Sequence, residues 1–564
     1  MLRPRDRARL RTSIGLLAGA IAIALASGAL AAAPVADSSV HAQHAMVVSE
    51  SQPASLAGIE ILNKGGNAID AACATALATG VTNASSCGIG GGGFMLIYLA
   101  STGKIYALDY RECAPLKATE NMYVRDGKPD EMLARSGPLA VAVPGEIAGI
   151  DAALKRFGTM KFHEVAAPAI KLARDGFALE PPVSRELPLM ASELKKDPGL
   201  AAIFFRPDGT PAKTGESIHE KELAATLEAL GDDPAHKFYN GQVATDLAAF
   251  VQEHGGILSA DDLAKYQPIW REPLHRAFQG YEIYVMPPPS SGGVLLEMLG
   301  MLEPGHLGGL GVDSPPYLAR LIEIMRQGFI DRDQYGDPDF VHVPIDTLLS
   351  AEHINEARER ALHHSAAQPA QPHDHGTANL LVVDKDGNVA ALTTTINTPF
   401  GARMMVPKLG IILNDEMDDF AVAPGVANAF HLAGAQPNAI APGKRPLSSM
   451  SPMIAIRKGK PMMTAGGSGG PAILSGVLQV TLNILVSHLG PAEAIETPRV
   501  HEQASPDVVA VEEAMPAKTR AALDKMGYQI RPVRGLGAVG AITIAPGNLR
   551  ADFDHRKSGA AIGN

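Results

Sequence analysis

The feature that most constrains this chain is the junction at Gly376-Thr377, where an irregular polar segment meets a hydrophobic hairpin. Residues 365–375 are rich in Ala, Gln, Pro and His and lack an apolar period, which predicts an exposed, irregular segment. Leu380–Val383 and Val389–Ile396 have strand-like sequences, and the Asp-Lys-Asp-Gly-Asn stretch between them favours a hairpin turn. Thr377 therefore stands at the start of a predicted central strand.

A threonine at a chain terminus has a particular chemistry, because it carries a hydroxyl nucleophile and an α-amine on one residue. The amine has an unperturbed pKa of about 7.7 to 8.0, so it can act as a base near neutral pH without a histidine. Cleavage of the Gly376-Thr377 bond would create such a residue. Gly-Thr also begins ordinary strands, so the dipeptide alone leaves both interpretations open.

Length and charge restrict the class of protein. The 564 residues, 46% of them hydrophobic, suffice for two or three ordinary domains or for one large compact one. The net charge is −11, and the body of the chain has no basic cluster that would follow a phosphate backbone. We therefore predict no nucleic-acid partner.

The N-terminal residues predict export. Five arginines between Arg3 and Arg11 precede an apolar run, Ile14–Leu25, and the small residues Ala29–Ala33 follow it. This is the pattern of a secretory signal peptide, which we place at residues 1–33. The mature protein would then be periplasmic or secreted. A membrane anchor is the alternative, although the apolar run is short for spanning.

The cysteines offer little chemistry. Cys73, Cys87 and Cys113 allow at most one disulfide, and no pair has the CxxC spacing. No zinc ligand set can be assembled at the usual spacings, so we predict no metal site.

The first hundred residues of the expected mature chain predict alternating strands and helices. The expected elements are a strand at Met46–Ser49, helices at Pro53–Lys64 and Ala68–Gly80, and strands at Phe94–Leu99 and Ile105–Tyr110. The glycine run Gly88–Gly93 precedes a strand, whereas nucleotide-binding loops follow a strand and open a helix. We interpret this run as a site of close backbone packing.

Three later segments carry groups suited to a charged substrate. Asn414–Phe420 is an acidic cluster that could bind an ammonium group or be a solvated loop. Arg445–Pro452 offers an arginine and three serine hydroxyls. Gly466–Gly470 precedes Pro471 and a predicted helix, Ala472–Leu489, and backbone N–H groups at such a helix start suit an anion or an oxyanion.

In their order and spacing these segments resemble the gamma-glutamyltranspeptidase family, whose members are self-processing N-terminal nucleophile hydrolases. The similarity runs from about Met46 to the C-terminus and rests on Gly376-Thr377, Asn397–Gly401, Asn414–Phe420, Arg445–Pro452 and Gly466–Gly470. The resemblance implies an α+β fold with four αββα layers. It also implies autoprocessing into a large subunit, residues 34–376, and a small subunit, residues 377–564, which stay together as a heterodimer.

The resemblance also implies a role for each site residue. Thr377 would be the nucleophile, assisted by Thr395, and Gly469 and Gly470 would form the oxyanion hole. The α-carboxylate of a γ-glutamyl group would be bound by Arg111, Ser448 and Ser449, and its α-ammonium by Asn397, Glu416 and Asp419. The implied reaction is γ-glutamyl transfer from glutathione or related compounds to water, amino acids or peptides, without a cofactor.

The chain departs from the family pattern at three places. Ala378-Asn379 stands where Thr or Ser and then His are common, Phe430 replaces a tyrosine of many bacterial members, and the segment 467–470 lacks the usual proline. The altered residues 378 and 379 leave open a related amide hydrolase of the cephalosporin (glutaryl) acylase type. A second alternative is a non-enzymatic exported binding protein that keeps the pocket.

Overall fold

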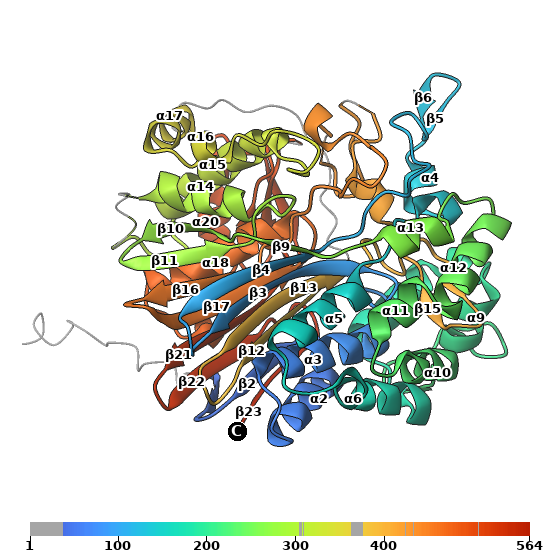
Figure 1. The fold of residues 1–564 in the computed structure, drawn as a ribbon. Coiled ribbons are helices and arrows are strands. Elements are labelled where there is room, and N and C mark those ends of the chain that lie inside the picture. Colours follow the sequence, from blue (N-terminus) through green and yellow to red (C-terminus); the bar gives the residue numbers. More distant parts are fainter. Residues whose placement is uncertain are drawn as a thin grey trace, which may run out of the picture. The chain divides into compact units, whose positions relative to one another are not determined.

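The computed structural model describes residues 38–303, 307, 309–361, 376–423, 425–432, 434–505 and 507–564. The predicted signal peptide and the predicted irregular segment 365–375 lie outside these residues. Two seven-stranded sheets form the centre of the unit that spans Ser39–Asn564 (Figure 1). Every ladder within these two sheets is antiparallel.

The first sheet contains the strand that begins beside Thr377. Its order is β23-β2-β12-β13-β3-β4-β9. The strands are β23 (Ala560–Gly563), β2 (Met46–Ser49), β12 (Ala378–Val383), β13 (Val389–Thr395), β3 (Gly92–Leu99), β4 (Lys104–Tyr110) and β9 (Ile269–Arg271). The hairpin predicted around residues 384–388 joins β12 to β13, with Gly387 at a φ of 83°.

The second sheet has the order β1-β22-β21-β17-β16-β11-β10. Its strands are β1 (Val40–Ala42), β22 (Asn548–Phe553), β21 (Ala538–Ala545), β17 (Lys460–Ser468), β16 (Met453–Arg457), β11 (Tyr281–Val285) and β10 (Leu274–Phe278). β17 packs against β12 and β13 of the first sheet, so the two sheets lie face to face.

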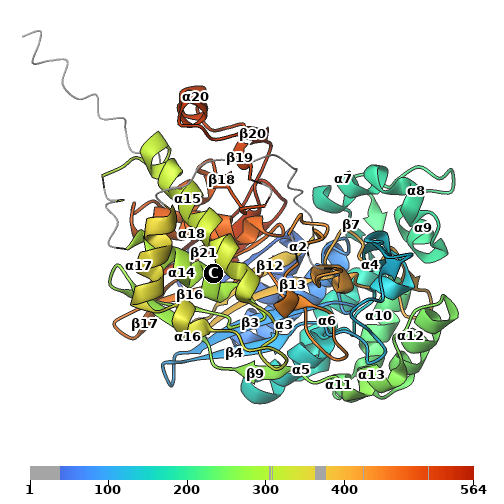
Figure 2. The ribbon, with the colours of Figure 1, turned by 90° about the horizontal axis from the view of Figure 1, so that it is seen from above.

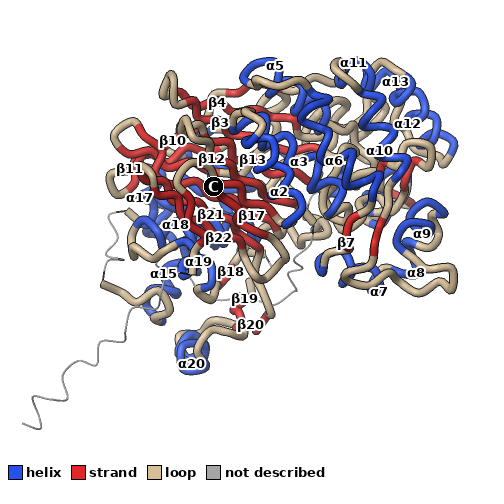
Figure 3. The backbone as a smooth tube through the Cα atoms, turned by 90° about the horizontal axis from the view of Figure 1, so that it is seen from below, coloured by secondary structure: helices blue, strands red, loops and turns tan. Residues whose placement is uncertain are grey.

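Helices cover both outer faces of the sheet pair (Figures 1 and 3). On the first sheet lie α2 (Gln52–Asn63), α3 (Ala68–Thr82) and α5 (Glu146–Phe157), and α6 (Phe162–Asp175) packs on α3. On the second lie α14 (Gly292–Leu302), α18 (Ala472–Leu485) and α19 (Pro491–Glu496), and α15 (Pro315–Asp331) and α17 (Ala351–Ala361) pack on α14. The predicted four-layered αββα architecture is confirmed.

The sequence of β12 shows why the strand lies between two layers. Successive side chains of a strand point to opposite faces. Leu380 and Val382 pack in the core under α2 and α3, whereas Leu381 and Val383 pack in the core between the sheets. All four are buried, and full burial of each contributes roughly 1.5 to 3 kcal/mol. A strand apolar on both faces is thereby held in the middle of the fold.

Further elements surround these layers (Figure 2). Beyond α6, a helical region contains α7 (Pro181–Leu189), α8 (Ala191–Leu194), α9 (Pro198–Phe204), α10 (Lys221–Leu230), α11 (Pro234–Tyr239), α12 (Gln242–Glu253) and α13 (Ala260–Lys265). A small sheet of β18 (Val500–His501), β19 (Val509–Glu512) and β20 (Ile530–Val533) adjoins α20 (Ala517–Lys525). Among the described residues, no helix is long and apolar enough to cross a membrane.

The glycine run acts in backbone packing, as predicted. A Cβ on Gly90 would lie 2.1 Å from the carbonyl oxygen of Ile412, and one on Gly91 would lie 1.9 Å from that of Thr395. Helix α18 ends at Leu485, four residues before its predicted end, and His488 has a φ of 59° that no α-helix accepts. Cys73, Cys87 and Cys113 are all free.

Candidate active site

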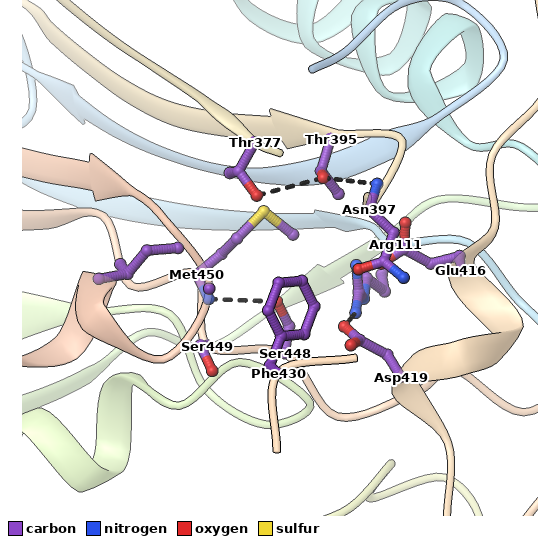
Figure 4. A pocket seen from close by; sticks show the side chains of 12 residues that line it. Arg111, Thr377, Thr395, Asn397, Glu416, Asp419, Phe430, Ser448, Ser449 and Met450 are labelled. Carbon is purple, nitrogen blue, oxygen red and sulfur yellow. Dashed lines mark hydrogen bonds and ion pairs between the residues drawn. The ribbon is translucent and has the colours of Figure 1, made fainter. Parts of the chain in front are cut away.

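Thr377 lies immediately before β12 at one end of the sheet pair and is almost fully buried. Ala378 pairs with Thr394 of β13, so the antiparallel register places Thr377 beside Thr395. The two hydroxyl oxygens are 3.2 Å apart, and Thr395 Oγ1 also accepts a hydrogen bond from the Asn397 amide at 2.8 Å (Figure 4). The hairpin thus brings the predicted nucleophile and its predicted assistant together.

The backbone at the junction is strained. Gly376 has a φ of 70° and Thr377 a φ of 66°. A β-branched residue rarely adopts this left-handed conformation, which costs on the order of 1 to 3 kcal/mol. A Cβ on residue 376 would lie 1.6 Å from the Asn397 carbonyl oxygen, so the site accepts only glycine. Glycine adopts a positive φ without strain, so the strain lies at Thr377, on the C-terminal side of the predicted cleavage bond.

The other end of the same cavity is charged. Arg111 follows β4, is 1% exposed, and forms ion pairs with Glu416 and, at 2.5 Å, with Asp419 (Figure 4). Burial disfavours the guanidinium charge, but Glu416, Asp419 and Glu112 outweigh burial, so the pKa of Arg111 is raised. Burial raises the pKa of Glu416, Asp419 and Glu112, that of Glu112 to about 8, while Arg111 opposes each rise.

The predicted serines and Asn397 complete the polar wall. Ser448 Oγ accepts a hydrogen bond from the Met450 amide at 3.1 Å, and Asn397 Nδ2 donates to the Asp415 carbonyl at 3.0 Å. The cavity is lined by Arg111, Thr377, Thr395, Asn397, Glu416, Asp419, Phe430, Ser448, Ser449, Met450, Gly470 and Ile473. Nine of the ten predicted site residues therefore face one cavity.

The tenth predicted residue, Gly469, does not line the cavity itself but adjoins Gly470, which does. Both glycines lie between β17 and α18, with φ values of 117° and 56°. The first turn of a helix leaves N–H groups without intrahelical partners, so this position suits a developing negative charge.

Comparison with known proteins agrees with this geometry. The family model described as Gamma-glutamyltranspeptidase matches residues 54–564. The chain belongs to this family. It is 37% identical to the glutathione hydrolase proenzyme of Escherichia coli over 529 residues, which cover 92% of this chain and 91% of that protein. A glutathione hydrolase proenzyme of Pseudomonas sp. is 38% identical and covers 95% of this chain and 94% of the relative.

Solved structures extend the comparison. A cephalosporin acylase from Bacillus halodurans has a TM-score of 0.84 and 28% identity, and covers 94% of this chain and 98% of that one. A chain of Helicobacter pylori gamma-glutamyltranspeptidase has a TM-score of 0.54 and 37% identity, and covers 57% of this chain and 92% of that one. This gamma-glutamyltranspeptidase family member thus has the fold of N-terminal nucleophile hydrolases and is an enzyme.

Phe430 covers the cavity in this family member. A Cβ on Gly470 would lie 2.6 Å from Phe430 Cδ1, so the ring packs directly on the glycine. Gln503 Nε2 donates to the Phe430 carbonyl at 3.1 Å, and Gln503 Oε1 is 2.9 Å from His501 Nε2. Burial lowers the pKa of His501 to about 4, so this ring stays neutral at physiological pH. A buried polar chain thus holds the backbone that carries Phe430.

Sequence reasoning missed two residues of the site. Lys557, between β22 and β23, donates from Nζ to the Gly376 carbonyl at 3.2 Å and to Ser468 Oγ at 2.9 Å. Arg332, after α15, donates to Ser449 Oγ at 3.4 Å, and burial lowers the pKa of its guanidinium to about 10. Neither lines the cavity itself, but Lys557 contacts the junction residue Gly376 and Arg332 contacts the lining residue Ser449. Neither has a local sequence pattern that sets it apart, because only tertiary packing creates these contacts.

Proposed function

We propose that this enzyme transfers the γ-glutamyl group of glutathione or related compounds to water, amino acids or peptides, after cutting itself at Gly376-Thr377. One observation carries the proposal: a single cavity holds a threonine hydroxyl at one end and a buried guanidinium with two carboxylates at the other. A γ-glutamyl group matches this arrangement, because its reactive carbonyl is separated from an α-carboxylate and an α-ammonium.

Self-cleavage would begin with attack of Thr377 Oγ1 on the carbonyl carbon of Gly376. The peptide nitrogen leaves, takes up the hydroxyl proton and becomes the α-amine of Thr377, while an ester joins Gly376 to Oγ1. Water then hydrolyses the ester to a Gly376 carboxylate and a free hydroxyl. The left-handed backbone at both residues and the hydrogen bond from Lys557 to the Gly376 carbonyl support this step.

Turnover would reuse the same oxygen. The Thr377 amine accepts the hydroxyl proton while Oγ1 attacks the γ-carbonyl carbon of the donor. The C–N bond breaks, the leaving amine takes the proton, and a γ-glutamyl ester remains on Thr377. Water or an acceptor amine then attacks the ester and restores the hydroxyl. The N–H groups of Gly469 and Gly470 would stabilise the oxyanion in both halves of the reaction.

Donor recognition would exchange ion pairs that already exist. Arg111 would move from Glu416 and Asp419 to the substrate α-carboxylate, with Ser448 and Ser449 as further donors. The two carboxylates, with Asn397, would take the α-ammonium instead. A zwitterionic substrate offers a carboxylate to Arg111 and an ammonium to Glu416 and Asp419, so each buried charge keeps a partner. A buried charge left without a partner would cost several kcal/mol.

Hydrolysis of glutaryl amides is the second candidate activity. The similarity to the Bacillus halodurans cephalosporin acylase favours it. A glutaryl group, however, has a carboxylate and no ammonium, so it could draw Arg111 away from Glu416 and Asp419 without giving these buried carboxylates a new partner. The charges at this end of the cavity therefore favour a γ-glutamyl donor.

Purified protein can decide between these activities. We expect two bands on a denaturing gel, a small subunit that begins Thr-Ala-Asn-Leu on N-terminal sequencing, and faster hydrolysis of γ-glutamyl-p-nitroanilide than of glutaryl-p-nitroanilide. The reverse substrate preference would support the acylase alternative. An uncut chain without turnover of either compound would contradict the proposal.

Export and subunit composition are part of the same proposal. Residues 1–33 would be removed as a signal peptide, and residues 34–376 and 377–564 would remain associated as a heterodimer in the periplasm or outside the cell. Antiparallel pairing of β2 with β12 supports the association, because these strands come from the two proposed subunits. Cell fractionation and sequencing of the large subunit would test both points.

A further inference from the structure

Three side chains of metal-binding type meet within the helical layer on the second sheet. Glu297 belongs to α14, Asp331 ends α15, and His353 belongs to α17. His353 Nε2 is 3.3 Å from Glu297 Oε1 and 3.2 Å from Asp331 Oδ2, and one ligand atom of each residue lies within 4.8 Å of the others. None of the three lines the cavity that contains Thr377.

A second observation points to a ligand at this cluster. The Glu297 side chain is fully buried, and its Oε2 has no hydrogen-bond partner among the described residues. The hydroxyl of Tyr335 is also buried without such a partner, and burial and the charges of Glu297 and Asp331 raise its pKa. A buried carboxylate oxygen without a donor is costly. A cation between the three side chains would balance the charge of the carboxylate.

The spacing fits a tetrahedral metal ion. Zinc binds imidazole nitrogen and carboxylate oxygen at about 2.0 to 2.1 Å, which places two tetrahedral ligands about 3.3 Å apart. The two separations from His353 Nε2 match this value. We propose that Glu297, Asp331 and His353 bind a divalent transition-metal ion, best matched by Zn²⁺, with water as fourth ligand. The imidazole disfavours Mg²⁺ and Ca²⁺, which prefer oxygen ligands only.

The surroundings of Asp331 resemble the outer shell of a metal site. Gln327 Nε2 donates to Asp331 Oδ2 at 2.8 Å, and Gln334 Nε2 donates to Oδ1 at 3.3 Å. Such bonds fix the orientation of a coordinating carboxylate. Arg360, at 3.9 Å from Asp331, is half-exposed and lies toward the solvent side of the cluster. In the absence of a metal ion, burial and the neighbouring Asp331 raise the pKa of Glu297 to about 10, so a protonated Glu297 beside Asp331 is the competing arrangement.

The proposed site would depart from the sequence-based prediction of no metal site, because its three residues lie far apart in the chain. His353 is 56 residues from Glu297 and 22 from Asp331, so no short spacing motif could reveal the cluster. The packing of three helices creates it. A bound ion would join α14, α15 and α17, and it would thereby fix Arg332, which follows Asp331 and donates to Ser291 and Ser449. Its role would be structural support of the cavity wall.

The test uses the full purified protein, stripped with a chelator and then titrated with Zn²⁺. We expect the wild type to bind one equivalent that raises the melting temperature, because a ligand of the folded state stabilises it by mass action. The double variant Glu297→Gln/His353→Gln should lose that equivalent and the stabilisation. His342→Gln, which changes an exposed histidine, is the matched control and should keep both.

Histidines at 363, 364, 373 and 375 could also bind Zn²⁺, so the titration is repeated with all four changed to Gln. This variant should still bind the one equivalent of Zn²⁺ that raises the melting temperature. Co²⁺ in place of Zn²⁺ should give the visible absorption of a tetrahedral ion, and the double variant should lose it. If the double variant fails to fold, the proposal is tested by the number of Zn²⁺ equivalents that the wild type binds and by its Co²⁺ spectrum. No binding up to about 1 mM, where even a weak site fills, would overturn the proposal. So would equal binding by wild type and a folded double variant.

Discussion

The two ends of the candidate cavity are built from different interactions. At the Thr377 end, neutral hydroxyl and amide groups form bonds of 2.8 to 3.2 Å around Thr395, and Lys557 adds one charged donor, at the Gly376 carbonyl. At the Arg111 end, one guanidinium and two carboxylates from distant segments form buried ion pairs. Neutral hydrogen bonds contribute about 1 kcal/mol each, whereas bonds to charged groups contribute about 1.5 to 3 kcal/mol. The groups proposed to react and the groups proposed to bind the donor therefore lie at opposite ends of the cavity, and the bonds at the charged end contribute more free energy each.

This difference predicts which step a substitution at each end of the cavity should impair. A change at the Thr377 end should remove the reaction while the charged end can still bind the donor. A change at the charged end should weaken donor binding or alter specificity while self-cleavage continues, because that step involves no external substrate. Variants that break this division would show that the two ends are coupled.

The largest effect is expected for Thr377→Ala. One oxygen must attack Gly376 and later the substrate, and Ala378 offers no substitute hydroxyl. We expect a single uncut chain without turnover on a denaturing gel and in a glutathione assay. Processing of the alanine variant at this bond, or its hydrolysis of glutathione, would contradict the assignment of the nucleophile.

Thr377→Ser is the matched control for that variant. It keeps the oxygen and loses only the methyl group that restricts χ1, so it should cut more slowly and retain some turnover.

The rate of glutathione hydrolysis by the wild type should fall as the pH drops below about 7 to 8, because the α-amine must be neutral to accept a proton.

Arg111→Lys should have the next largest effect. An ammonium keeps the charge but cannot hold a carboxylate with two parallel hydrogen bonds. We expect a loss on the order of 2 kcal/mol, or about 30-fold in kcat/KM for glutathione, with normal self-cleavage. The exposed Arg125→Lys serves as control. Unchanged kinetics in the Arg111 variant would remove this residue from the donor site.

Asp419→Ala should change specificity more than overall activity. Its proposed partner is the donor α-ammonium, which a glutaryl donor lacks. The ratio of γ-glutamyl to glutaryl turnover should therefore fall about tenfold, in line with the loss of one charged hydrogen bond. Equal losses with both donors would indicate that Asp419 only supports Arg111, with which it pairs at 2.5 Å.

The sequence predicted the parts of the site that local patterns encode. The hairpin, its hydrophobic central strand and the glycines before α18 follow from residue type and spacing, and the ends of the strands were correct to within a few residues. The clustering of Arg111, Glu416 and Asp419 came from the family resemblance, because no local pattern joins segments about 300 residues apart. Their mutual pairing could not be predicted, since it depends on burial.

Lys557 is another residue whose contact could not be predicted from local sequence. Its substitution should have the smallest effect of the variants considered, a slower self-cleavage. The residue reaches Gly376 because β23 pairs with β2 at the edge of the first sheet, a contact between the two ends of the chain. Lys557→Met should slow self-cleavage about five- to tenfold, because the carbonyl oxygen loses a charged donor while strain and nucleophile remain. Lys557→Arg should restore most of the rate, and the exposed Lys525→Met should not alter it. The rate is measured by following loss of the uncut chain on denaturing gels after synthesis. If Lys557→Met and the wild type cut equally fast, the bond to Gly376 only helps to hold the C-terminal residues in place, and polarisation of the carbonyl must come from elsewhere at the Thr377 end.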